Sequence, residues 1–415
     1  MPDTAQTKRI YFDHAATTPL DPRVRAAMDA AQSRELANPS SLHAEGRAAR
    51  AAVEWARAEV MKLVGATGGV VFTSGGTEAD NLALIGTTLF DDLRPPHVVT
   101  SAIEHPAITA TCRWLATRCG AAVTTLPVTS DGLIEPAALA DALRPETRLV
   151  SIMAANNVVG TLQPIRDLAA IAHEHGALFH TDAVQAVGRV PIDMVRDGID
   201  LLSLSAHKIH GPTGIGALAF NTGVVVEPIL HGGGQEGGLR SGTENLSGIV
   251  GLGEAARLAR ELRATDAPRL VRLRDRLIDG VLGAIPNAYV IGHRYRRLPG
   301  HACFGFAGLE GEAIKLMLAL DEAGIAVSTG SACSAHQVQE PSHVLTAMGY
   351  DPFRARGALR VTLGRFNADD EVDRFLAVLP QVVRRLRPIT TRSAEPMRQF
   401  TDTCQQECAE HGSHA

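Results

Sequence analysis

The amino-acid sequence predicts an α/β protein with two domains: a large one built on a mainly parallel, seven-stranded sheet, and a smaller α+β domain. Three observations lead to this prediction. Between about residues 45 and 265, short runs rich in β-branched residues alternate with helical patterns. After about residue 265 an arginine-rich amphipathic pattern and mixed elements replace this alternation, and residues 391–415 are polar. Because helices connect parallel strands, we expect helices on both faces of the sheet.

Seven runs in the first region have the length and composition of strands. They occupy residues 70–73, 97–101, 122–128, 148–153, 177–182, 200–205 and 215–220. Two intervening stretches, residues 77–90 and 164–176, carry apolar residues at spacings of three and four, as amphipathic helices do. Gly176 ends the second stretch and is expected at the C-terminal cap of that helix.

The change of pattern near residue 265 sets the predicted domain limits. Residues 17–265 form the predicted large domain. Residues 1–16 and 266–390 form the predicted small domain, which carries a mobile loop around Cys333. Residues 391–415 are predicted to be a disordered tail, because they have no apolar pattern that a core could bury.

Composition and charge exclude several classes of protein. The chain has 415 residues and a net charge of −5, and its basic residues are scattered, so no surface for nucleic acid or an anionic membrane is predicted. No apolar run reaches the ~18 residues of a membrane-spanning helix, and the first residues lack the apolar centre of a signal peptide. We therefore expect a cytoplasmic protein. Six cysteines without a CxxC motif do not indicate a disulfide framework.

A glycine-containing turn, "TSGGTEADN" at residues 73–81, follows one predicted strand and opens a helix. Its glycines let the backbone approach a ligand, and Thr77 and the first amides of the helix can bind phosphate. The alternative is a tight turn without a ligand. Because the motifs of nucleoside triphosphatases and of dinucleotide-binding proteins are absent, any phosphate bound here belongs to another ligand.

Polar side chains follow three other predicted strands. Asp182 can pair with a protonated ring nitrogen, Gln185 and Asn157 can bind a ring oxygen, and His105 can lie over an aromatic ring or move protons. Each residue taken alone is equally typical of a cap or a turn. Because the carboxyl ends of parallel strands meet at one edge of a sheet, we expect these side chains to gather there.

Lys208 lies in "SLSAHKIHGPTGIG" (residues 203–216), between an apolar run and a glycine-rich turn. A lysine among uncharged neighbours loses hydration, which frees its amine to react with an aldehyde. A phosphate turn, a strand-end acid and such a lysine are the parts of a pyridoxal phosphate site. The alternative for Lys208 alone is a surface lysine in a loop.

Two further residues are candidates in the C-terminal third. Cys333 stands among small polar residues and is expected to be exposed, as a reacting cysteine must be. Arg360 has the planar guanidinium that suits a substrate carboxylate, although a structural ion pair is the alternative. Cys112 and Cys303 lie in apolar settings and are predicted to be packing residues.

Taken together, these segments resemble the cysteine desulfurases of the NifS and IscS type, within the class V aminotransferase family. The matching segments are "YFDHAATTPLDPRV", "ANPSSLH", "TSGGTEADNLA", "EHPA", "NNVVG", "HTDAVQAVG", "SAHKIHGPTGIGAL", "HGGGQEGGLRSGTEN", "STGSAC" and "LGRF". They extend over nearly the whole chain except the tail. The resemblance implies the fold of the type I pyridoxal phosphate-dependent transferases.

The resemblance also implies a role for each matching residue. Lys208 would hold pyridoxal 5'-phosphate, Asp182 its ring nitrogen, and His105 would stack on the ring. The other implied contacts are Gln185 and Asn157 near the ring hydroxyl, Gly76, Thr77, Ser205 and His207 at the phosphate, Thr243 reaching the phosphate from the second subunit of a homodimer, Asn38 and Arg360 at the carboxylate of L-cysteine, and Cys333 at its sulfur.

The implied reaction converts L-cysteine to L-alanine. Lys208 would remove the α-proton, and the Cys333 thiolate would take the sulfur as a persulfide. An acceptor protein, either a cluster scaffold or a sulfur carrier, would receive the sulfur for iron–sulfur cluster assembly or another thiolated product. Three alternatives stay open: a selenocysteine lyase, a cysteine lyase of the same fold, and a non-catalytic scaffold that docks sulfur acceptors.

The chain departs from the family pattern at several places. Val158 stands where the family usually has glutamate, Ala206 where it has glycine, His210 where it has tyrosine, and Thr213 where it has lysine; the segment from Cys333 to Glu340 is one residue longer. We expect these changes to affect acceptor choice and the rate of sulfur transfer. In the tail, Cys404, Cys408, His411 and His414 have spacings that could ligate a metal, against the default of a solvated tail.

Overall fold

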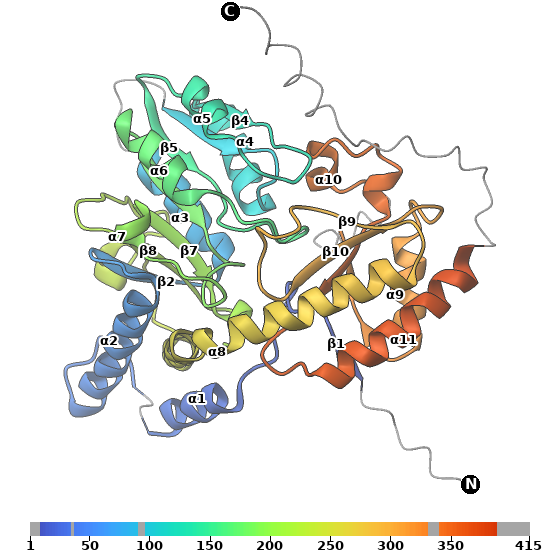
Figure 1. Ribbon diagram of the computed structural model, residues 1–415. Coiled ribbons are helices and arrows are strands. Elements are labelled where there is room, and N and C mark those ends of the chain that lie inside the picture. Colours follow the sequence, from blue (N-terminus) through green and yellow to red (C-terminus); the bar gives the residue numbers. More distant parts are fainter. Residues whose placement is uncertain (1–8, 35–36, 90–95, 331–339, 388–415) are drawn as a thin grey trace, which may run out of the picture.

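The computed structural model describes residues 9–34, 37–89, 96–330 and 340–387 (Figure 1). Its main feature is a seven-stranded sheet. The strands are β2 (Gly69–Thr73), β3 (His97–Ser101), β4 (Ala122–Leu126), β5 (Thr147–Ser151), β6 (Leu178–Asp182), β7 (Leu201–Ser205) and β8 (Gly216–Phe220). Their spatial order is β2-β8-β7-β6-β5-β3-β4, and β8 alone runs antiparallel to its neighbours. The predicted mainly parallel sheet is confirmed, and each strand lies within two residues of its predicted limits.

Both faces of this sheet are buried. Adjacent residues of a strand point to opposite faces, and in this sheet both sets of residues belong to apolar cores. Val98 and Leu201 belong to a core with α3 (Gly76–Thr88) and α4 (Pro106–Cys119). Their neighbours Val99 and Leu202 belong to a second core with α2 (Ala44–Val64), α6 (Ile165–Glu174) and the first part of α8 (Leu246–Ala284). The near-continuous apolar strands in the sequence are therefore explained by helices on both sides.

The helices begin and end at residues that suit helix termini. Pro106 is the first residue of α4, and the side chain of His105 caps that helix. In α6, Glu174 is the last helical residue and His175 is the cap; Gly176, which was predicted as the cap, follows one residue later with φ +73°. The remaining helices of this part are α1 (Pro22–Arg34), α5 (Pro136–Ala142) and α7 (Met194–Asp197).

A four-stranded antiparallel sheet forms the C-terminal part, in the order β12-β13-β10-β9. Its strands are β12 (Ser328–Thr329), β13 (Leu359–Thr362), β10 (His301–Phe306) and β9 (Ala288–Val290). Phe304 of this sheet packs in one core with residues of α8, α9 (Ala313–Glu322) and α11 (Asp369–Leu386). The strand β1 (Ile10–Tyr11) joins the same core by pairing with β11 (Ile325–Ala326). The short helix α10 (His343–Ala347) precedes β13.

The helix α8 is continuous from Leu246 to Ala284, so the pattern change near residue 265 falls inside a helix. Pro268 lies within α8 and cannot donate a backbone hydrogen bond. A proline in a helix of this length bends it, and Figure 1 shows the two parts of α8 running in different directions. The first part packs on the large sheet and the second part packs on the small one.

Among the residues that the structure describes, no helix combines the length and the apolar composition that crossing a bilayer requires.

Candidate active site

A cavity of about 290 Å³ opens at the carboxyl edge of the large sheet. It is lined by ten of the predicted site residues: Gly76, Thr77, His105, Asn157, Asp182, Gln185, Ser205, His207, Lys208 and Arg360. The first nine lie at or just beyond the ends of β2, β3, β5, β6 and β7. Their convergence agrees with the expectation that polar strand-end residues meet at one edge of the sheet.

Asp182 is the last residue of β6 and is 6% exposed. Its Oδ1 accepts a hydrogen bond from the backbone N–H of Val184 at 2.9 Å. Burial raises the pKa of the Asp182 carboxyl, because the ionised form is poorly solvated. A cationic group in the cavity would favour the ionised form, so Asp182 is suited to binding a protonated ring nitrogen.

Two more buried acids, Asp80 and Glu104, accompany Asp182, and the sequence reasoning did not identify them. Asp80 lines the cavity, is 1% exposed, and its Oδ1 has no hydrogen-bond partner among the described residues. Burial and the nearby Asp182 carboxylate raise the pKa of Asp80. Asp80 follows Thr77 by three residues in α3, which places the two on one face of the helix. That spacing was the available signal, but the sequence alone did not show which face meets the cavity.

Glu104 lies in the loop after β3 and is fully buried. Its Oε1 accepts hydrogen bonds from Ser101 Oγ at 2.5 Å and from the Met153 backbone N–H at 3.0 Å. Burial raises the pKa of Glu104 from 4.5 to about 8. Glu104 therefore carries a proton at neutral pH and adds no negative charge beside Asp182.

We expect Glu104→Gln to gain stability relative to the parent protein as the pH rises from 5 to 8. Folded Glu104 binds a proton up to pH about 8, whereas unfolded Glu104 releases it near pH 4.5. The parent protein therefore loses folding free energy across this window, on the order of 3 kcal/mol, and the glutamine variant does not. Urea unfolding at pH 5 and pH 8 measures the difference. Glu135→Gln, at an exposed position, is the control. A difference between Glu104→Gln and the parent that stays constant over this window would contradict the prediction.

Lys208 ends a short 3₁₀ turn, Ala206–Lys208, directly after β7. Its amine donates hydrogen bonds to the backbone oxygens of Ala15 at 2.5 Å and Ala16 at 2.8 Å. Gln185 Nε2 also donates to the Ala15 oxygen, at 2.9 Å. The segment after β1 therefore holds Lys208 and Gln185, two of the predicted cofactor residues. The sequence did not indicate this contact, because Ala15 lies far from both residues in the chain.

The cavity is also lined by the start of α3, which begins at Gly76. The residue before it, Gly75, is the N-terminal cap and has no side chain that could bond to the N–H groups of the first turn. The N–H groups of a helix start attract an anion. The Nδ1 of His207 lies 3.2 Å from Thr17 Oγ1, and burial, then Lys208 and Arg189, lower the pKa of His207 to about 4. A neutral His207 can bind phosphate by hydrogen bonding, without contributing a charge.

His105 and Asn157 are positioned by hydrogen bonds of their own loops. The Nδ1 of His105 accepts from the Ala107 N–H at 3.1 Å, so a neutral ring carries its proton on Nε2. The loop of Asn157 is held by buried Asn156, whose Nδ2 donates to the Ile103 oxygen at 2.9 Å. Gly160 ends that loop at φ +80°, where a Cβ would lie 2.7 Å from the ring of His301, so only glycine fits there.

Arg360 reaches the cavity from β13 of the small sheet and is 2% exposed. Its Nη1 donates to the Asn157 backbone oxygen at 3.0 Å, and its Nη2 donates to Asp13 Oδ1 at 2.8 Å. Its Nε has no partner among the described residues. The structure therefore brings the predicted carboxylate-binding residue to the cofactor residues, together with an acid that the sequence reasoning did not assign.

Several predicted residues lie elsewhere. Asn38 is exposed and is not among the residues that line the cavity, and its Oδ1 accepts from the Ser40 N–H at 2.8 Å. Thr243 is exposed at a second cavity of about 220 Å³, which Arg240 and Ser74 also line. Cys333 and the tail residues Cys404, Cys408, His411 and His414 lie outside the described residues.

The two cysteines predicted to be packing residues are buried. Cys112 is 3% exposed and Cys303 is fully buried. Burial raises the pKa of each thiol to about 12, so neither forms a thiolate at neutral pH. Neither cysteine is therefore a nucleophile in this fold.

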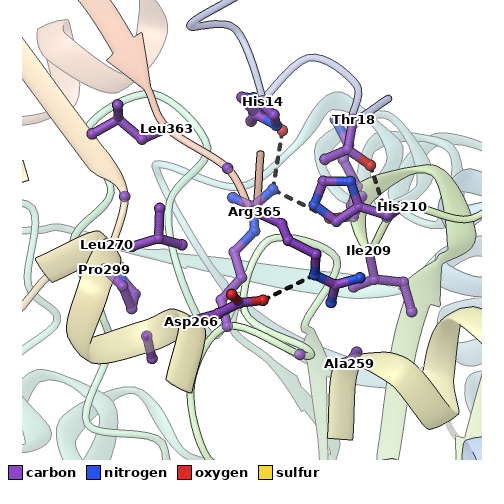
Figure 2. A pocket seen from close by; sticks show the side chains of 16 residues that line it. His14, Thr18, Ile209, His210, Ala259, Asp266, Leu270, Pro299, Leu363 and Arg365 are labelled. Atoms are coloured by element: carbon purple, nitrogen blue, oxygen red, sulfur yellow. Dashed lines mark hydrogen bonds and ion pairs between the residues drawn. The ribbon is translucent and has the colours of Figure 1, made fainter. Parts of the chain in front are cut away.

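Two departures from the family pattern also have structural surroundings. Val158 packs in an apolar cluster with Ile103 and Leu345 and does not line the cavity. His210 lines a small pocket that Lys208 also lines, and Figure 2 labels His210 there. Its backbone N–H donates to Thr18 Oγ1 at 2.8 Å, and its ring packs edge-on against Phe366 at 5.1 Å between centroids. In the same pocket Arg365 pairs with Asp266 at 2.9 Å, so these contacts connect α8, β7 and the C-terminal part.

These features define a class of site. A helix start for a phosphate, a buried carboxylate for a cationic ring nitrogen, and a lysine amine for an aldehyde lie around one cavity. Asp80 Oδ1 is a buried polar atom without a hydrogen bond in the described residues, with His180 Nε2 3.8 Å away, as expected where a polar ligand belongs. The donor set therefore fits pyridoxal phosphate.

Comparisons with known proteins agree with this class. The family described as aminotransferase class-V matches residues 10–375. The cysteine desulfurase IscS of Methanosarcina thermophila is 45% identical over 94% of this chain and 96% of its own length. A cysteine desulfurase of Cereibacter sphaeroides is 47% identical over 94% of this chain and 100% of its own length. The solved structure of a NifS-like protein has a TM-score of 0.84 and 37% identity over 91% of this chain and 100% of that chain.

The chain belongs to the class V aminotransferase family, which confirms the resemblance and the predicted fold. Within that family it is a pyridoxal phosphate-dependent cysteine desulfurase.

Proposed function

We propose that the cavity at the carboxyl edge of the large sheet is where L-cysteine is converted to L-alanine and its sulfur is passed to Cys333. The observation that carries the proposal is the convergence of ten predicted residues around about 290 Å³. Five strand ends and β13 supply them, so the set is not explained by one local turn.

Each proposed role follows from the surroundings of the residue. Gly76, Thr77, Ser205 and His207 bind the phosphate of the cofactor, and Asp182 binds the proton-bearing ring nitrogen. When bound, pyridoxal phosphate supplies an electron sink for the carbanion formed at the substrate α-carbon. Lys208 holds the cofactor and takes the α-proton at Nζ, and Arg360 orients the substrate carboxylate. The thiolate of Cys333 attacks the substrate sulfur, leaving a persulfide on the enzyme and releasing alanine.

We also propose a homodimer in which Thr243 serves the neighbouring subunit. Within one chain Thr243 is exposed and lines the cavity of about 220 Å³ rather than the cofactor cavity. A residue that binds phosphate only across an interface has such a position. The sulfur then passes to an acceptor protein, either a cluster scaffold or a sulfur carrier.

The two cores support the proposed division into a large domain and a small one, with the boundary inside α8.

We expect Asp182→Asn to lower the maximal rate of alanine formation about 10³-fold. The amide cannot stabilise positive charge on the ring nitrogen, so transition-state stabilisation is lost. Asp80→Asn is the matched control: Asp80 lines the same cavity, and burial together with the Asp182 carboxylate raises the pKa of its carboxyl, so the amide removes less negative charge there. That variant should lose less than about tenfold. Equal losses in the two variants would mean that the charge of Asp182 is not what the reaction requires.

A further inference from the structure

The guanidinium of Arg360 has an acidic partner within the chain, Asp13. Arg360 Nη2 donates to Asp13 Oδ1 at 2.8 Å. The Arg360 side chain is 2% exposed and the Asp13 side chain is 19% exposed. A buried cation without a counter-charge is costly, so Asp13 compensates Arg360 before any substrate carboxylate binds.

The backbone places Asp13 beside Arg360. Asp13 forms a β-bridge with Thr362, two residues beyond Arg360 in β13. The Ala15 N–H donates to Thr362 Oγ1 at 2.9 Å, which fixes the segment on the other side of Asp13. Backbone contacts between the N-terminal segment and the small sheet therefore hold Asp13 and Arg360 side by side.

A substrate carboxylate at Arg360 meets the negative charge of Asp13. The two carboxylates repel each other at short range in a partly buried site, which weakens binding of the incoming one. They can still share the arginine, because a guanidinium has five N–H donors and the contacts with Asn157 and Asp13 are made by one donor each of Nη1 and Nη2. The site is therefore able to bind a carboxylate, with its affinity reduced by Asp13.

We propose that Asp13 sets the affinity of the site for α-carboxylates: it orients Arg360 and, through its charge, weakens the binding of substrate and product. Because alanine keeps the carboxylate of cysteine, the same repulsion speeds product release. The proposal rests on the proposed function, since it takes Arg360 as the carboxylate-binding residue. Asp13 is a positioning residue and does not touch the reacting atoms.

The test compares the binding of L-alanine and L-alaninamide to the cofactor-loaded enzyme, followed by cofactor absorbance. The amide lacks the carboxylate charge, so the ratio of the two dissociation constants isolates carboxylate recognition. In Asp13→Asn we expect L-alanine to bind about tenfold more tightly or better, with little change for L-alaninamide. Asp13→Glu keeps the charge, and its ratio should stay near that of the parent. Asp369→Asn, which breaks an exposed pair with Arg272 at 2.7 Å, is the surface control.

An unchanged or smaller preference for L-alanine in Asp13→Asn would overturn the proposal and leave Asp13 with a structural role only. Asp13→Ser also removes the charge, and the same ratio decides the question if the asparagine variant does not fold. Arg360→Gln tests the underlying assignment separately, because it should remove the preference for L-alanine. If Arg360→Gln keeps that preference, the carboxylate is bound elsewhere and the role of Arg360 in the proposed function is wrong.

Discussion

We expect Lys208→Ala to abolish both the reaction and the colour of the enzyme. We expect alanine formation from L-cysteine to fall at least about 10⁴-fold, because this variant loses the covalent attachment of the cofactor and the base that takes the α-proton. The absorbance near the visible that covalent attachment produces should disappear. Alanine release and an absorbance spectrum measure the two effects on the same sample.

The chain offers an unusually clean control for this prediction. It has four lysines, Lys8, Lys62, Lys208 and Lys315. Lys62 pairs with Glu59 at 2.7 Å and Lys315 pairs with Glu312 at 2.8 Å, and both side chains are more than half exposed. Lys315→Ala should therefore keep the colour and the rate. Borohydride reduction of the parent protein should label the peptide of Lys208; a label on another lysine would contradict the assignment.

Cys333→Ala should leave no enzyme-bound sulfur after L-cysteine is added. The variant has no thiolate at that position to attack the substrate sulfur, so we expect persulfide to fall at least about 10²-fold. Mass spectrometry of alkylated protein measures the persulfide, and alanine is measured in parallel. Buried Cys112 and Cys303 cannot replace Cys333, since burial raises the pKa of both thiols to about 12.

Cys119→Ala is the matched control, because Cys119 is the partly exposed one of the free cysteines that the structure describes. It should form persulfide at the parental level. A Cys333→Ala variant that still releases sulfide and alanine at the parental rate would instead indicate a cysteine lyase or selenocysteine lyase. A chain without colour or turnover in any form would indicate a non-catalytic scaffold.

The strands and the polar residues at their ends could be predicted from the sequence because both are local properties. An apolar run between turn signals is a strand whatever its partners are, and a parallel sheet gathers its carboxyl ends at one edge. Asp182 and Ser205 end adjacent strands, and Lys208 follows three residues beyond Ser205. Their meeting at one cavity therefore needed only the order of elements in the chain.

Other features depended on packing between distant segments. The 39-residue helix α8 crosses the predicted boundary at 265, because cores on both sides stabilise it despite Pro268. Asn38 was expected at the substrate and is exposed in this chain. Asp80 and Glu104 were missed because an acid in a helix or a loop has no sequence signal for burial, and burial is the largest cause of the raised pKa of each carboxyl.

By itself, the sequence determined the α/β class, the seven strands and the set of residue types that a pyridoxal phosphate enzyme requires, since these follow from periodicity and from side-chain chemistry. Only the tertiary structure decided the charges and partners of those residues. Asp13 and Arg360 are 347 positions apart and form an ion pair because β13 lies beside the N-terminal segment. The proton held by Glu104 likewise follows from its burial, which depends on how the whole chain packs around it.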